Sequence, residues 1–247
     1  MIAARQIAFG RGAAKGLSAK DYVQDGLIAM WDGIENAGWG VHDANATMWK
    51  DLTGKGSDWK LNPNEGKFSI GIDYVELLNR ISWTGTGYIN TPSWSNDTDI
   101  KTLEGVLDTG LVETDNNAPW AVIVSFDLFK EQGYYRNALF VDIASGNIIH
   151  GLGLQLENPS LPTERGQNSI SCNSDDMKYY MNGVEIINIS KIKRRVVNYS
   201  HNNCPLGIYS GRLARHTKIK NLRIYNRALT ADEIAHNYNI DKARFGL

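Results

Sequence analysis

The residues of this chain best suited to catalysis are carboxylates that stand two positions apart. Some glycoside hydrolases carry an E-x-D-x-x-E pattern, because alternate residues of a strand face the same way and retaining chemistry needs carboxyl groups about 5–5.5 Å apart. Glu113 and Asp115 supply the first two acids of this pattern, but Ala118 occupies the third position. Asp97 and Asp99 are likewise followed by a threonine where the third acid would stand. We therefore predict that the protein is not an enzyme and has no catalytic residues.

Other catalytic and phosphate-binding patterns are also missing from the sequence. It contains no G-x-S-x-G elbow of a serine hydrolase, and the five histidines stand in no recognisable signature. Gly151 and Gly153 lack the third glycine of a nucleotide-binding loop. These observations favour a role in binding over a role in catalysis.

Loop carboxylates and the two cysteines are the groups that could bind a metal. Loops can hold Ca²⁺ with carboxylates and backbone carbonyls at irregular spacing, and Asp97 and Asp99 are the first candidates. A structural Ca²⁺ ion is therefore the one cofactor that the sequence suggests. Cys172 and Cys204 match no zinc motif, so they are either buried free thiols or a disulfide.

Aromatic side chains in polar loops are the residues best suited to hold a ligand. Sugar recognition needs flat aromatic faces against sugar C–H groups, together with polar groups for the hydroxyls. Trp31, Trp49 and Trp120 lie in or beside strand patterns and are expected in the core. We predict exposure and contact with a glycan or a protein for five other aromatic residues: Trp94, Tyr134, Tyr135, Trp39 and Trp59.

The charge pattern limits the partners of the protein. A formal net charge of −1 gives no global attraction for nucleic acid or an anionic membrane. No stretch reaches the roughly 20 apolar residues of a transmembrane helix, and we expect no signal peptide.

Residues 1–20 contain basic residues and no acid, which indicates an N-terminal arm that is either a frayed terminus or a tether for a partner protein. The basic residues between 191 and 195 are expected to lie on a surface strand.

The order of the expected elements indicates an all-β protein. Strand-like segments recur from residue 27 to residue 225, and Asn182-Gly183 between two β-rich arms predicts a tight hairpin. Thr230 and Glu233 form the pattern of a capping box, which predicts one helix over residues 231–240. Strands without intervening helices predict an antiparallel sandwich, not an alternating α/β fold.

Three segments carry a family pattern. They are residues 26–32 with 49–52, the hairpin at 180–184, and the ending R-I-Y-N-R-A-L-T-x-x-E-I at 223–234. They resemble laminin-G-like domains of the concanavalin A-like lectin/glucanase superfamily, in proteins of gut bacteria and their phages. The resemblance implies one two-sheet jelly-roll β-sandwich over residues 21–247, with the first and last strands adjacent. The family often has Asp-Glu where this chain has Lys220-Asn221, so no site is carried over from those acids.

These observations together predict a non-catalytic module that binds a glycan or a cell-surface polymer. Its expected place is a phage virion or a bacterial surface assembly, outside the cell. Two alternatives stay open. A structural or decoration protein of a virion would contact only virion proteins, and a glycoside hydrolase would need two carboxylates converging in a groove at the distance given above.

Overall fold

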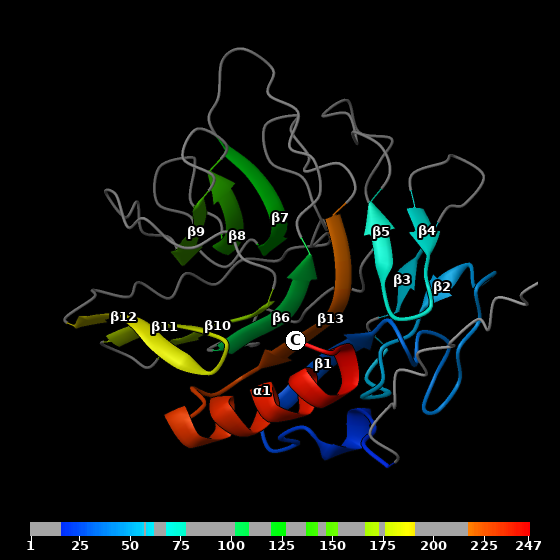
Figure 1. The fold of residues 1–247 in the computed structure, drawn as a ribbon, viewed down its shortest axis with the longest axis horizontal. Helices are drawn as coiled ribbons and strands as arrows, with labels where there is room; N and C mark the ends of the chain where they lie inside the picture. Colours follow the sequence, from blue (N-terminus) through cyan, green and yellow to red (C-terminus); the bar gives the residue numbers. More distant parts are fainter. Residues whose placement is uncertain are drawn as a thin grey trace, which may run out of the picture.

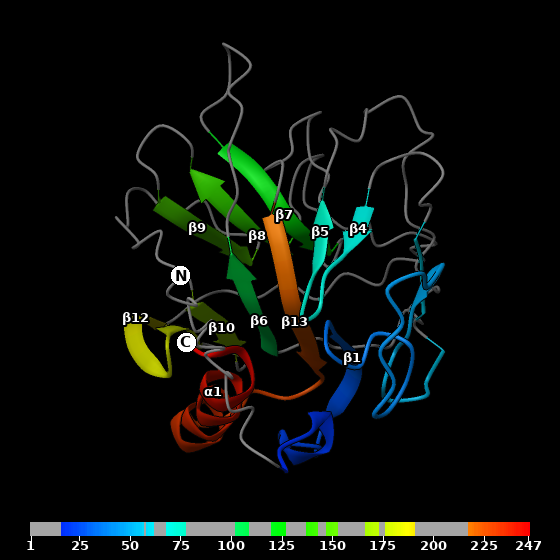
Figure 2. The ribbon, with the colours of Figure 1, turned by 45° about the vertical axis from the view of Figure 1, so that its right-hand side comes forward.

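The computed structural model consists mostly of β-strands, with one α-helix at the C-terminal end of the part of the chain that it describes. The described residues are 16–56, 58–61, 68–77, 102–108, 120–126, 137–142, 147–152, 166–172, 176–190 and 217–247. The strands are antiparallel, and the sheets that they form are curled (Figures 1 and 2). The predicted all-β character and the helix at the end of the chain are confirmed.

The main sheet has eight strands. Seven of them follow one another across the sheet in the order β12 (Val184–Ser190), β11 (Asp176–Met181), β10 (Gly166–Cys172), β6 (Thr102–Asp108), β13 (Thr217–Tyr225), β5 (Val75–Leu77) and β4 (Phe68–Ile70). The eighth, β1 (Leu27–Asp32), shares the edge of β13 with β5: β5 pairs with the beginning of β13 and β1 with its end. The expected contact between the first and last strands is therefore confirmed.

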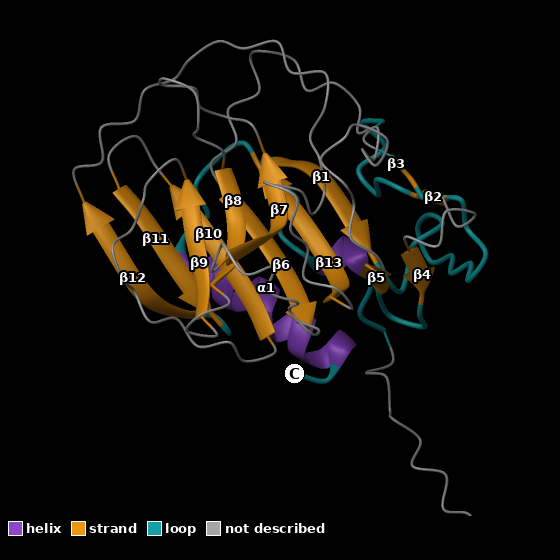
Figure 3. Ribbon diagram, turned by 90° about the horizontal axis from the view of Figure 1, so that it is seen from above, coloured by secondary structure: helices purple, strands orange, loops and turns teal. Residues whose placement is uncertain are grey.

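Two smaller sheets complete the described strands. One consists of β7 (Trp120–Phe126), β8 (Asn137–Asp142) and β9 (Asn147–Leu152), and the other of β2 (Met48–Trp49) and β3 (Trp59–Lys60). In Figure 1 the three-stranded sheet lies above β6 and β13, whereas the helix lies below them, and Figure 3 shows the helix behind the strands. The helix and the three-stranded sheet thus lie on opposite sides of the main sheet.

Most of β13 is buried. Residues 219–225 are all buried, although the segment contains three polar side chains. Leu222 and Ile224 alternate with Asn221 and Arg223, so the apolar and polar residues point to opposite faces of the sheet. The polar face of β13 meets the helix.

The C-terminal helix α1 (Ala231–Phe245) begins where the sequence predicts but ends later. Thr230 and Glu233 form the expected capping box, and Gly246 ends the helix in the left-handed conformation with φ 66°. The prediction stopped at residue 240, where the apolar pattern of the sequence stops. The additional turn carries Asp241, which is buried by polar contacts that an apolar pattern does not reveal.

The predicted hairpin at residues 182 and 183 is confirmed. Asn182 has φ 51° and Gly183 has φ 75°, so both central residues adopt the positive φ that a type I′ turn requires. The turn joins β11 to β12 and lies against α1, because a Cβ on Gly183 would lie 2.9 Å from Tyr238. Glycine therefore satisfies both the backbone and the packing at this position.

Three tryptophans pack together beside β1. Trp31 and Trp49 are buried, as predicted. Trp59 is also buried, at 1% exposure, so the prediction that it contacts a ligand at the surface is wrong. The reason is strand pairing: Trp59 stands opposite Trp49 in β2–β3, and its ring centroid lies 4.9 Å from that of Trp31.

Among the described helices, none has the length and apolar character needed to cross a membrane.

Candidate functional site

Trp39 is the predicted ligand-binding residue that the structure describes at the surface, with 37% of its surface exposed. The other candidates, apart from the buried Trp59, lie outside the described residues: Trp94, Tyr134, Tyr135, Asp97 and Asp99. Their ligand contacts, and Ca²⁺ binding by the two aspartates, stay predictions. The described part of the predicted binding surface is therefore the segment 36–43, called the Trp39 loop below.

The tip of the Trp39 loop is a tight turn between two glycines. Gly38 has φ 135° and Gly40 has φ 69°, conformations that residues with a Cβ rarely adopt. The Val41 N–H donates to the carbonyl of Gly38 at 2.9 Å, and the Ala37 N–H donates to the carbonyl of Val41 at 3.1 Å. These bonds close the turn and leave Trp39 at its tip.

The base of the loop is closed by a reciprocal pair of hydrogen bonds. The side-chain amide of Asn36 donates to the carbonyl of Asp43 at 2.8 Å, and the N–H of Asp43 donates to Asn36 Oδ1 at 2.8 Å. His42 Nδ1 lies 3.2 Å from the carbonyl oxygen of Ile34, to which it can donate. Because Asn36 is buried, the loop is tied to the interior at both of its ends.

The carboxylate of Glu35 connects the loop to two other parts of the chain. Its Oε2 accepts the N–H of Gly40 at 2.8 Å. Its Oε1 accepts the N–H of Ala19 at 2.8 Å and Nη2 of Arg244, on α1, at 2.9 Å. One buried side chain thus holds the Trp39 loop, the beginning of the described chain and the helix together.

The segment around Ala19 places a lysine against the exposed tryptophan. Ser18 and Asp21 form a capping box that starts the short 3-10 helix η1 (Ala19–Asp21). Lys20 Nζ lies 5.3 Å from the centroid of the Trp39 ring, within the range of a cation–π contact. Residues 18–20 were predicted to belong to the N-terminal arm, but they pack on the domain, and Ala19 is fully buried. The proposed docking of the arm on a partner stays a prediction, because residues 1–15 lie outside the described part of the chain.

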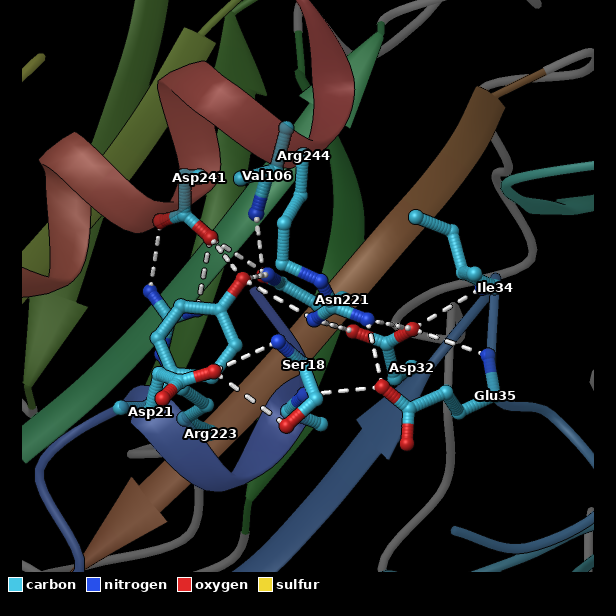
Figure 4. Close-up of polar contacts among 12 residues, drawn as sticks. Ser18, Asp21, Asp32, Ile34, Glu35, Val106, Asn221, Arg223, Asp241 and Arg244 are labelled. Carbon is cyan, nitrogen blue, oxygen red and sulfur yellow. Dashed lines mark hydrogen bonds and ion pairs between the residues drawn. The ribbon is translucent and has the colours of Figure 1, made fainter. Parts of the chain in front are cut away.

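Beneath η1, ion pairs attach the helix to the sheet (Figure 4). Arg244 donates to both oxygens of Asp32, on β1, at 2.6 and 3.1 Å. Burial raises the pKa of Asp32 above its ordinary value, although the Arg244 guanidinium acts in the opposite direction. This pair fixes the last turn of α1 against the strand that leads into Glu35.

A second arginine forms the centre of this arrangement. Arg223, on β13, is fully buried and donates to both oxygens of Asp241 on α1 at 2.8 Å each. It also donates to Glu104, on β6, at 3.0 Å. Burial alone lowers the pKa of Arg223, but the attraction of Asp241 and then of Glu104 outweighs burial and holds this pKa well above its ordinary value. The guanidinium therefore remains charged inside the protein.

Tyr22 joins the N-terminal segment to the same centre. Its hydroxyl donates to Asp241 at 2.7 Å and accepts from the amide of Asn221 at 3.1 Å. Its ring stacks on Arg223, with the guanidinium carbon 4.1 Å from the ring centroid. Burial, and then the Asp241 charge, raise the pKa of the Tyr22 hydroxyl well above its ordinary value, so it remains a donor.

This buried ion network comprises Asp32, Glu104, Arg223, Asp241 and Arg244. Each member is paired with an opposite charge, and all are buried or nearly so. Within the part of the chain that the structure describes, no group of three His, Cys, Asp or Glu side chains is placed to hold a metal ion. The charges of the network are thus paired with one another in the interior, whereas Trp39 is exposed at the surface.

Two residues of this site were not identified from the sequence. The sequence pattern places Lys20 in a basic arm, and no motif marks Glu35. The Ser18–Asp21 spacing is the signal that could have shown an ordered turn before residue 21. The partners of Glu35 are separated from it by as many as 209 residues, so no local pattern reveals them.

Lys220 and Asn221, which stand where the laminin-G-like domains that the sequence resembles often have Asp-Glu, make polar contacts inside the protein. Lys220 forms a short ion pair with Asp73, and both side chains are largely buried. Asn221 donates to Asp241 at 2.6 Å and accepts from the N–H of Val106 at 3.1 Å. Both residues serve the packing of β13.

Comparisons with known proteins show similarity of fold at low sequence identity. No protein-family model and no curated protein matches the sequence. A Trypanosoma rangeli sialidase in complex with sialic acid superposes with a TM-score of 0.60 and 13% identity, over 89% of this chain and 33% of the sialidase chain. The binding domain of Paraclostridial Mosquitocidal Protein 1 gives a TM-score of 0.52 and 17% identity, over 87% of this chain and 52% of that chain. This chain thus spans about a third of the sialidase and about half of the binding-domain structure.

The sialidases correct one prediction. We predicted from missing sequence patterns that the protein is not an enzyme, but the structures found first in the comparison are sialidases, which are enzymes. That prediction is wrong, because the fold of this chain recurs within glycoside hydrolases whatever its carboxylate spacing. At 13% sequence identity the similarity shows the fold alone. It does not assign the activity of the complete sialidases to this chain, which covers about a third of their length.

Proposed function

We propose that this protein binds glycans, and that it is a laminin-G-like, concanavalin A-like jelly roll of two packed sheets whose loop aromatics contact the sugar. The observation that carries the proposal is the presentation of Trp39. The indole stands at the tip of a loop whose turn, base and glycines are all held by hydrogen bonds, yet 37% of the residue is exposed. A large aromatic side chain held in this way at a surface is typical of a recognition site.

The physical basis of the proposal is preorganisation. A sugar presents a face of C–H groups that packs on a flat aromatic ring, and its hydroxyls need donors and acceptors around that ring. His42, Asp43 and Asn45 follow Trp39 in the chain, are exposed and carry such groups. Because the loop is already ordered by Glu35 and Asn36, binding loses little conformational entropy.

The comparisons support this proposal through the fold. The solved structures that superpose on the chain include a sialidase holding sialic acid and the binding domain of a mosquitocidal protein. Trp94, Tyr134 and Tyr135 are proposed to extend the same surface. The resemblance of the sequence to domains of gut bacteria and their phages supports a place on a bacterial surface or a virion, with virion proteins as further partners.

A glycan array followed by isothermal titration calorimetry tests the proposal. The wild type is expected to bind at least one class of glycan, and Trp39→Ala is expected to weaken that binding about tenfold, the equivalent of about 1.4 kcal/mol, because the stacking face is lost. Val184→Ala is a matched control, because Val184 is 61% exposed on β12 and takes no part in the Trp39 loop.

Two outcomes contradict the proposal. If the wild type binds no glycan, glycan recognition is wrong. If Trp39→Ala binds as tightly as wild type, the Trp39 loop is not the site, and Trp94→Ala then tests the other proposed aromatic residues.

A further inference from the structure

We propose that the Trp39 loop selects glycans that carry a carboxylate, with Lys20 as the group that recognises the negative charge. This inference rests on the proposed glycan binding and goes further, because it names the class of sugar. The geometric basis is the position of Lys20 Nζ, 5.3 Å from the centroid of the exposed Trp39 ring. The ammonium group thus lies over the ring of an exposed tryptophan.

Lys20 is exposed, and among the described residues it takes part in no ion pair. Asp21, the next residue in the chain, and Glu35, which anchors the Trp39 loop, have other partners. Asp21 Oδ2 accepts the N–H of Ser18 at 2.6 Å within its capping box. Glu35 is buried and accepts from Gly40, Ala19 and Arg244.

The backbone positions of Lys20 and Trp39 are set by the fold. Glu35 Oε1 holds the backbone of Ala19, the residue before Lys20, and Glu35 Oε2 holds the backbone of Gly40, the residue after Trp39. One carboxylate therefore anchors the chain beside both recognition groups. Such a pair favours a ligand that carries a negative charge near an apolar face.

Sugars with a carboxylate on the ring match this pair. Sialic acids and uronic acids both carry a carboxylate beside the C–H groups of a sugar ring, so the ring can pack on Trp39 while the carboxylate meets Lys20.

Titration calorimetry with matched glycans tests this inference. Sialyllactose and lactose form one acidic and neutral pair, and a galacturonic acid disaccharide with a galactose disaccharide forms the other, which separates the two sources of the carboxylate. The wild type is expected to bind at least one acidic glycan about fivefold more tightly than its neutral partner, which corresponds to about 1 kcal/mol. Lys20→Gln is expected to weaken binding of the acidic glycan more than that of the neutral one and so remove this preference, whereas Lys20→Arg is expected to retain it.

The outcomes separate failure of this inference from failure of the proposed function. If no glycan binds, acidic or neutral, both are wrong. If acidic and neutral glycans bind equally, or if Lys20→Gln keeps the preference, only the assignment of Lys20 is wrong. If Lys20→Gln weakens the binding of acidic and neutral glycans alike, Lys20 supports Trp39 and does not recognise the negative charge of the ligand. This result also overturns the inference.

Discussion

Replacement of Arg223 by methionine is expected to destabilise this protein strongly, because it leaves two buried carboxylates without their cation. Arg223 donates to Asp241 through two bonds of 2.8 Å and to Glu104 through one of 3.0 Å, and none of the three side chains is exposed. Methionine fills much of the same volume, so the loss of charge pairing dominates over the loss of packing.

The size of the effect follows from these contacts. Removing one partner of a buried ion pair costs about 3–5 kcal/mol, since the remaining charge stays desolvated and unpaired. Asp241 retains the hydroxyl of Tyr22 and the amide of Asn221, and Glu104 retains the amide of Asn237, which keeps the cost within this range. The total stability of a domain is about 5–15 kcal/mol, so the loss is a large part of it.

Urea denaturation measures this change in the free energy of unfolding. Arg227→Met is the matched control, because Arg227 pairs with Glu233 at the surface and its loss is expected to cost about 1 kcal/mol or less. If Arg223→Met does not fold, Tyr22→Phe tests the same network, with an expected cost of about 1–1.5 kcal/mol for the lost hydroxyl.

A deficit below about 1 kcal/mol for Arg223→Met refutes the role assigned to the network.

Two further predictions concern the helix and the hairpin. The hydrogen bonds from Arg227 lower the pKa of Glu233 from 4.5 to about 2. Glu233→Gln is therefore expected to lower the free energy of unfolding by about 1 kcal/mol at neutral pH, and urea titrations should show the stabilities of wild type and variant converging as the pH falls from 4.5 towards 2. A stability difference that stays constant with pH would contradict this. Gly183→Ala should cost about 2–4 kcal/mol, because it combines positive φ with a Cβ that meets Tyr238. Gly54→Ala, with positive φ in open space, should cost only about 1 kcal/mol in the same thermal or urea assay, and equal losses would rule out the contact with the helix.

Features held by contacts between near neighbours in the sequence could be predicted from the sequence. The Asn182-Gly183 turn and the Thr230–Glu233 capping box each depend on residues a few positions apart, and both were found as expected. The all-β character with one helix at the end was predictable for a similar reason, because strand patterns, turn residues and a capping box are local signals. The exposure of Trp39 followed from its position between two glycines.

Features that depend on distant partners could not be predicted in this way. The sequence pattern placed Trp59 at the surface, but pairing with Trp49 buries it. It ended the helix at residue 240, because a polar residue such as Asp241 resembles a solvent-exposed helix end until its partner is known. That partner set includes Tyr22, 219 residues away.

The binding surface shows the same division. The sequence by itself determined that this is a strand-rich protein with an exposed tryptophan on a glycine-flanked loop. Only the tertiary structure decided that Lys20 stands over Trp39 and that Glu35 anchors the chain beside both. The physical reason is that charge and hydrogen-bonding capacity are properties of single residues, whereas their partners are chosen by the way strands and helix bring remote segments together.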